Sequence, residues 1–134
     1  MSRAFTKEVD DAPVAAAKRL GVPVPDPNYL TPAGLAAARA ELDATTDGDR
    51  RRELADHLAT AEALEPPTDR GEVGLGARVT VTGAVYELVG AIEADPKHGR
   101  VFWQSPIGRA LWRCRVGDTV VLPRGEVEII AIDY

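Results

Sequence analysis

SPIGRALW, residues 105–112, decides the fold, because it is the one helical pattern in a half of the chain otherwise made of short strands. Ser105 is a favourable N-cap, and Pro106 suits the first helical position, where no backbone N–H is needed. Ile107 and Leu111 fall on one face and can pack onto a sheet. We therefore predict a short helix that begins after Ser105 and lies against β-structure.

The residues on either side of this helix alternate between apolar and polar, which is typical of half-buried strands. The predicted strands are 78–82, 85–92, 101–104, 118–122 and 126–132. Gly, Pro and Asp residues that favour turns separate them. Short strands joined by turns predict an antiparallel sheet covered by one short helix, which is an α+β arrangement.

Two amphipathic helices are predicted between residues 29 and 65. The first begins with Thr31 as N-cap and Pro32 at the first helical position, and the second begins with Asp49 as N-cap. The apolar residues that recur at helical spacing are Leu35, Ala38, Leu42, Leu54, Leu58 and Ala61. Two such helices joined by a few residues predict an antiparallel helical hairpin, or short coiled coil.

Composition divides the chain into four segments. Residues 1–28 are predicted to form an extended arm, because alternating prolines favour extended backbone, although VAAAKRL (14–20) favours one or two helical turns. Residues 29–65 form the hairpin, and the prolines and glycines of 66–75 mark a linker. Residues 76–134 form the β-rich domain.

The net charge of −5 argues against general affinity for nucleic acid or anionic membranes. The exception is a basic stretch with one acid and five cations: Lys97, Arg100, Arg109, Arg113 and Arg115. The single cysteine, Cys114, cannot form an internal disulfide, and no Cys/His cluster has metal-ligand spacing. We expect no metal and no other cofactor.

The first residues, MSRAFTKEVDD, lack the apolar segment of a signal peptide. No apolar run approaches the roughly 18 residues of a membrane span. We therefore expect a cytoplasmic protein that makes no membrane contact and is a monomer.

Five segments of the β-rich domain, taken together, resemble the C-terminal domain of the bacterial Gre transcription factors. These segments are GARVTV (76–81), YELVGAIEADP (86–96), SPIGRAL (105–111), VGDTV (116–120) and the closing IAIDY. In addition, NYLTPAGL (28–35) and ARAEL (38–42) are similar to the start of the Gre coiled coil.

The resemblance implies a coiled coil joined to an FKBP-like globular domain, with RNA polymerase as the partner. In this family the globular domain grips the rim of the polymerase secondary channel, and the coiled coil points toward the catalytic centre. The residues that the resemblance assigns to polymerase docking are Glu93, Asp95, Ser105, Pro106, Ile107 and Gly108.

The hairpin tip departs from the family pattern. Gre cleavage factors carry acidic residues at the tip that help to hold a catalytic magnesium ion, in a DLSENAEY type of segment, which this chain lacks. A first helix from Pro32 to Thr45 would span only about 21 Å. In length the hairpin looks like that of the nucleoside diphosphate kinase regulator subgroup. Three tip carboxylates, Asp43, Asp47 and Asp49, remain as candidates.

The resulting interpretation is a regulator, not an enzyme, that binds RNA polymerase at the channel rim and partly fills the channel with a short hairpin. A Gre-type cleavage factor that uses the three tip aspartates is the main alternative. A peptidyl-prolyl isomerase, suggested only by the implied fold, and an RNA-binding protein built on the basic stretch are the others.

Several other residues are predicted to have structural roles or none. Trp103 and Trp112 are predicted in the core or at its edge, and His57 and His98 are given no role. Arg113 stands where the family usually has glycine, so the turn after the helix is expected to differ.

Overall fold

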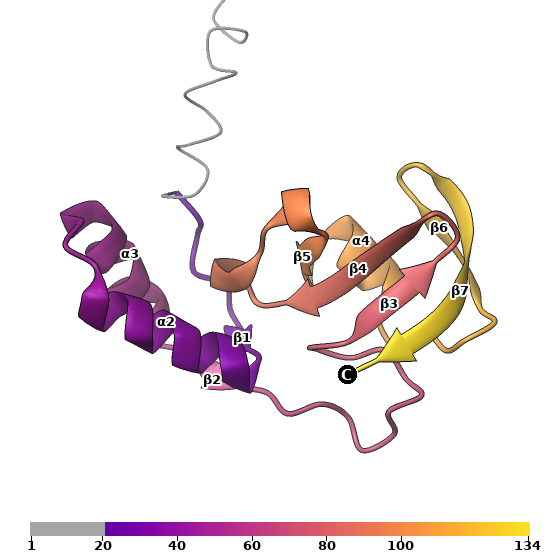
Figure 1. The fold of residues 1–134 in the computed structure, drawn as a ribbon, viewed down its shortest axis with the longest axis horizontal. Helices are drawn as coiled ribbons and strands as arrows, with labels where there is room; N and C mark the ends of the chain where they lie inside the picture. The colour runs from indigo at the N-terminus through magenta and orange to yellow at the C-terminus, as the bar shows by residue number, and fades with distance from the viewer. Residues whose placement is uncertain (1–20) are drawn as a thin grey trace, which may run out of the picture.

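Two helices occupy one end of the molecule and a curled β-sheet the other (Figure 1). The computed structural model describes residues 21–134, so the helical turn predicted at 14–20 lies outside the described residues. The mixed α+β class is as predicted. None of the helices in residues 21–134 is long and apolar enough to cross a membrane.

The first helix, α2 (Pro32–Ala44), begins where the sequence predicts. Thr31 has extended backbone, and its hydroxyl oxygen accepts the N–H of Gly34 at 2.9 Å. Pro32 takes the first helical position. The helix ends at β-branched Thr45, whose backbone is again extended. Local capping chemistry therefore defines both ends of α2.

The second helix, α3 (Gly48–Leu58), begins earlier than predicted. Its N-cap is Asp47, whose Oδ1 accepts the N–H groups of Asp49 (3.0 Å) and Arg50 (3.3 Å). The prediction of Asp49 as N-cap is wrong because Gly48 belongs to the helix, which leaves the earlier carboxylate in the capping position. Asp49 instead lies in the first turn.

The sheet contains five strands in the order β5-β4-β3-β7-β6. Their bounds are β3 Arg78–Val81, β4 Ala84–Val89, β5 Arg100–Phe102, β6 Thr119–Leu122 and β7 Gly125–Asp133. The prediction of a wholly antiparallel sheet is wrong, because β4 and β5 are parallel. Between them the chain passes through two 3-10 turns, η3 (Ala91–Glu93) and η4 (Pro96–His98), and so re-enters the sheet in the same direction.

The helix α4 (Pro106–Leu111) begins after Ser105, whose hydroxyl oxygen accepts the N–H of Gly108 at 3.1 Å. Gly108 packs directly against the backbone carbonyls of Phe102 and Trp103, where a Cβ would collide. Leu111 is fully buried in the core that α4 and the sheet share. The core residues from the sheet include Val79, Val81, Leu88, Val101, Val120, Leu122 and Ile129.

A small parallel sheet that the sequence did not predict closes the base of the helices. It pairs β1 (Tyr29–Leu30) with β2 (Glu62–Ala63), the segments that precede α2 and follow α3. Asn28 adds to it by donating from Nδ2 to the carbonyl of His57 (2.8 Å) and to Thr60 Oγ1 (3.2 Å). We call α2 and α3 the helical pair. The segments that enter and leave this pair are therefore held together at its base.

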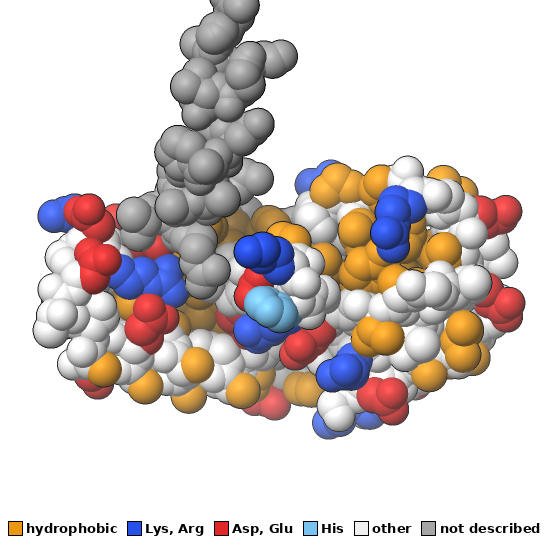
Figure 2. Space-filling view, turned by 45° about the horizontal axis from the view of Figure 1, so that its top comes forward, with side chains coloured by type: hydrophobic (Ala, Val, Ile, Leu, Met, Phe, Trp, Pro, Cys, Tyr) orange, Lys and Arg blue, Asp and Glu red, His pale blue; other side chains and the backbone are white. Residues whose placement is uncertain are grey.

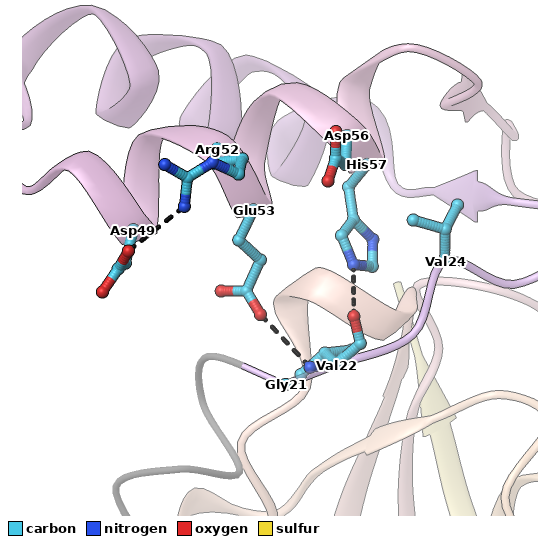
Figure 3. A pocket seen from close by; sticks show the side chains of 8 residues that line it. All are labelled: Gly21, Val22, Val24, Asp49, Arg52, Glu53, Asp56 and His57. Atoms are coloured by element: carbon cyan, nitrogen blue, oxygen red, sulfur yellow. Dashed lines mark hydrogen bonds and ion pairs between the residues drawn. The ribbon is translucent and has the colours of Figure 1, made fainter.

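Residues 21–28, which we call the strap, lie against α3 (Figure 3). The Val22 N–H donates to Glu53 Oε2 at 3.2 Å, and the Val22 carbonyl lies 2.9 Å from His57 Nε2. Glu53 and His57 are one helical turn apart, so one face of α3 holds both backbone groups of a single residue. A cavity of about 370 Å³ lies between the strap and α3.

Candidate functional site

The predicted docking residues occupy two segments that flank β5: the η3–η4 turn and the start of α4. Pro106 is exposed, and Ser105 is half-buried with its hydroxyl engaged as the helix cap. Ile107 packs against the core, and Gly108 is buried. Only Pro106 therefore presents most of its side chain at this end of α4.

Glu93 faces inward, and its carboxylate joins the two parts of the molecule. Its Oε2 accepts the N–H groups of Thr31 (3.0 Å) and Gly90 (2.9 Å), and its Oε1 accepts the Thr31 hydroxyl at 2.7 Å. The Glu93 side chain is only 3% exposed, and an Arg100 nitrogen lies 3.6 Å from it. We call Thr31, Gly90, Glu93 and Arg100 the Glu93 joint. Glu93 thus fixes the start of α2 on the part of the chain from β3 to β7, which we call the sheet region.

Asp95 lies at the surface beside the joint. Its backbone exchanges two hydrogen bonds with Arg100, and its side chain, 28% exposed, lies 2.7 Å from His98 Nδ1. Gly99 ends this turn in the left-handed conformation, with a φ of 76°. The chain therefore turns between Asp95 and Gly99. Asp95 and Pro106 are therefore the docking candidates that a partner can reach.

Aromatic side chains lie next to α4. The Trp103 ring lies 5.1 Å from Trp112, 6.0 Å from Tyr29 and 6.3 Å from Phe102, measured between ring centroids. Trp103 and Trp112 are partly buried against the core, as predicted. Because Tyr29 belongs to β1, this cluster is a second contact between the base of the helical pair and the sheet region.

The basic stretch does not form one continuous cationic surface. Arg100 lies 3.5 Å from Glu87 and 3.6 Å from Glu93, while Arg115 pairs with Asp69. The hydrogen bond from Arg115 holds the pKa of Asp69 below its ordinary value. Internal carboxylates thus neutralise several of these cations, which weakens the RNA-binding alternative.

Two of the three tip aspartates have separate local roles, and Asp43 is exposed near the end of α2. Asp47 caps α3, and Asp49 pairs with Arg52 at 3.2 Å. Arg51 donates to the carbonyl of Leu42 (2.7 Å) and to that of Thr45 (3.3 Å), so a cation lies at the end of α2. Within residues 21–134, no group of three or more His, Cys, Asp or Glu side chains is arranged to hold a metal ion.

Two residues that follow α4 have distinctive local settings. Arg113 adopts a φ of 67°, the left-handed region that favours glycine. Burial, with a smaller contribution from Asp118, raises the pKa of the Cys114 thiol, whereas the neighbouring arginines alone would lower it. Cys114 is therefore a partly buried thiol that ionises less readily than a free cysteine.

The sequence interpretation missed the inward roles of Glu93 and His57. Both are buried polar side chains, and both bind segments distant in sequence. Glu93 had a detectable signal, because an acid inside the apolar run VGAIEA is unusual for a solvated loop. For His57 the sequence offers no comparable signal, since α3 is polar on most of its surface.

Comparisons with known proteins identify the family of the sheet region. Residues 67–134 match the family model described as "Transcription elongation factor, GreA/GreB, C-term". The transcription elongation factor GreA of Thermomicrobium roseum is 44% identical over 77 residues, which are 53% of this chain and 49% of that protein. The match thus spans about half the length of this relative.

GreA of Chloroflexus aurantiacus is 34% identical over 125 residues, which cover 87% of this chain and 74% of that protein. Among solved structures, the GreA factor homolog 1 protein of Thermus thermophilus is 24% identical with a TM-score of 0.43 over 80% of this chain and 99% of that one. Because the family model and the Chloroflexus relative together cover the sheet region and the helical pair, the chain belongs to the GreA/GreB family of transcription elongation factors.

Proposed function

We propose that this chain is a non-catalytic regulator that binds bacterial RNA polymerase at the rim of the secondary channel. The sheet region makes the contact, and the helical pair α2–α3 partly occupies the channel. Membership of the GreA/GreB family supports the choice of partner. The short length of α2 and α3, and their fixed attachment to the sheet region, support the proposed obstruction of the channel.

The observation that carries the proposal is the combination of short length and fixed attachment. With 13 residues, α2 is about 20 Å long, and α3 has 11 residues. The Glu93 joint, the β1–β2 pair and the Asn28 contacts fix the base of this pair. A short, rigid projection can obstruct a channel, but it stops short of a metal buried deep inside it.

The chemistry of the tip supports the same conclusion. A carboxylate that caps a helix accepts backbone N–H groups, and a carboxylate paired with arginine is already neutralised. Asp47 and Asp49 would have to abandon these contacts to bind a magnesium ion together with Asp43. The tip therefore favours obstruction over assistance to hydrolysis.

A competition pulldown tests the proposal. Immobilised core RNA polymerase should retain the chain, and an excess of a full-length GreA factor should displace it. The variant Pro106→Asp should bind at least about fivefold more weakly, since it places a charge at the exposed start of α4. As a matched control, Pro123→Asp changes an exposed proline in the β6–β7 turn and should bind like the wild type. Retention that GreA does not reduce would contradict the proposed site.

A further inference from the structure

Arg113 occupies a backbone position that favours glycine. The residue follows α4, with a φ of 67°, and is the single non-glycine residue with a positive φ in residues 21–134. The conformation is required locally, because it lets the Arg113 N–H donate to the Val73 carbonyl at 2.8 Å while the Cys114 N–H donates to Leu111. Glycine would make the same bonds without steric conflict at Cβ.

The side chain of Arg113 gains little inside the molecule. It is 78% exposed, and its one ion pair is a 3.6 Å approach to Glu72, a carboxylate that also lies 3.7 Å from Arg115. An exposed ion pair at this distance contributes little to stability. The strained backbone is therefore not offset by a contact within the described chain. Strain of this kind points to a role in binding.

The surroundings of Arg113 indicate what it binds. Trp112 precedes it, and the exposed Arg109 lies in the last turn of α4. Val116, three residues after Arg113, is an exposed apolar side chain, and Figure 2 shows hydrophobic side chains gathered over the β-sheet end of the molecule. Two exposed guanidinium groups near an exposed apolar side chain suit a surface that offers both carboxylates and apolar area.

The overall charge favours a protein partner over a nucleic acid. The chain carries a net charge of −5, so its long-range field repels phosphate backbones. A local cationic site next to an apolar surface can still select an acidic patch at short range. The six residues of α4 span only about 9 Å, so Arg113, just beyond the end of the helix, is separated from the docking candidate Pro106 at its start by little more than the length of α4.

We propose that Arg113, together with Arg109, determines specificity by contacting an acidic segment of RNA polymerase next to the α4 docking surface. This inference rests on the proposed function and adds the chemistry of the contact. It also explains why arginine stands where the fold favours glycine: the side chain serves recognition at the expense of stability.

The test is a pair of measurements on Arg113→Gly. Its melting temperature should rise by about 2–5 °C, because the backbone strain is removed. Its affinity for core polymerase should fall by roughly three- to tenfold, with a weaker dependence on salt. Arg113→Lys keeps both the charge and the strain, so it should melt like the wild type and retain most of the affinity. Arg109→Ala should also weaken binding.

The matched control is Arg124→Gly, which removes an exposed arginine from the β6–β7 turn and should leave polymerase binding unchanged. Arg113→Gly with wild-type affinity, or with a lowered melting temperature, would overturn the inference. If the wild-type chain binds naked RNA as tightly as polymerase, with a steep salt dependence that Arg113→Gly reduces, the partner is a nucleic acid and the inference is wrong. If the wild-type chain does not bind polymerase at all, the proposed function fails first.

Discussion

A single buried carboxylate, that of Glu93, holds the helical pair against the sheet. It accepts hydrogen bonds from Thr31, 62 positions earlier in the chain, and from Gly90. A buried carboxylate and buried N–H groups are costly to leave without a hydrogen-bond partner. The Glu93 joint therefore depends on the presence of this carboxylate. This residue therefore fixes the direction in which α2 leaves the sheet region.

Replacing Glu93 with alanine should lower the free energy of unfolding by about 2–4 kcal/mol, because two backbone N–H groups lose their acceptor. Urea unfolding followed by circular dichroism measures the change. Glu87→Ala is the matched control, since Glu87 is 39% exposed and also lies near Arg100. It should change stability by less than about 0.5 kcal/mol. Equal losses of stability for the two substitutions would contradict the claim that the buried Glu93 hydrogen bonds stabilise the protein.

Cys114 should react slowly with alkylating reagents. Because burial raises the pKa of its thiol, less thiolate is present at any pH below that pKa than in a free cysteine. Iodoacetamide labelling between pH 7 and 10, followed by mass spectrometry, should be slower for the folded chain than for the chain in urea. The rate should still be rising with pH where that of free cysteine levels off. Faster labelling of the folded chain at pH 7.5 would show an activated thiol.

Single residues were predictable where their partners are close in sequence. The caps at Thr31 and Ser105 depend on N–H groups three residues away, and both were predicted from the sequence. Glu93 was interpreted as a surface contact because its partner Thr31 is remote in sequence. Asp47 and Asp49 flank one glycine, so the sequence alone does not decide which of them caps α3.

At the scale of the helices and strands, the position of α2 on the sheet region depends on one glycine. Gly34 is buried against the Glu93 side chain, and a Cβ there would collide with the carboxylate. Gly34→Ala should therefore destabilise the protein by about 1–3 kcal/mol. In contrast, a Cβ at Gly48, in the first turn of α3, would meet nothing within 4 Å.

Gly48→Ala should stabilise the protein by a few tenths of a kcal/mol up to about 1 kcal/mol, because alanine favours helix and limits the unfolded chain. Thermal unfolding of both variants checks the contrast. If Gly34→Ala left the stability unchanged, α2 would not pack against the Glu93 side chain as described.

The start of α3 should respond to its cap and not to the acidity of the tip. Asp47→Ala should destabilise the protein by about 1 kcal/mol, because two N–H groups lose their acceptor. Asp43→Ala, at an exposed position of α2, should change stability by less than about 0.5 kcal/mol. Chemical denaturation with and without magnesium measures both. Stabilisation of the wild type by magnesium that disappears in both variants would instead indicate a metal site.

Strand periodicity predicted where the strands are but not how they pair. Alternation located β3, β4, β6 and β7 to within a few residues, since each strand buries one face. The parallel pairing of β4 with β5 depends on the path of residues 90–99 through two 3-10 turns. The β1–β2 pair consists of two residues in each strand, which is too short for a periodic signal.

At the scale of the whole molecule, the sheet region and the helical pair are joined at two places. The base of the helical pair contacts the sheet region through the Glu93 joint and through Tyr29 against Trp103. The strap adds a third segment along α3. Because the Glu93 joint and the Tyr29–Trp103 contact both cross between the two ends, they restrict how far the helical pair can pivot on the sheet region. In the proposed function, this restriction is what would let a short helical pair obstruct the polymerase channel.

Transcript cleavage in arrested elongation complexes tests the central claim most directly. We predict that the chain, added alone to RNA polymerase, does not increase the release of short 3′ RNA fragments above the intrinsic rate. Added together with a GreA factor, it should slow the cleavage that GreA stimulates, in proportion to its concentration. Faster fragment release on addition of the chain alone, abolished by replacing Asp43, Asp47 and Asp49 with alanine, would show instead that the tip reaches the catalytic metals.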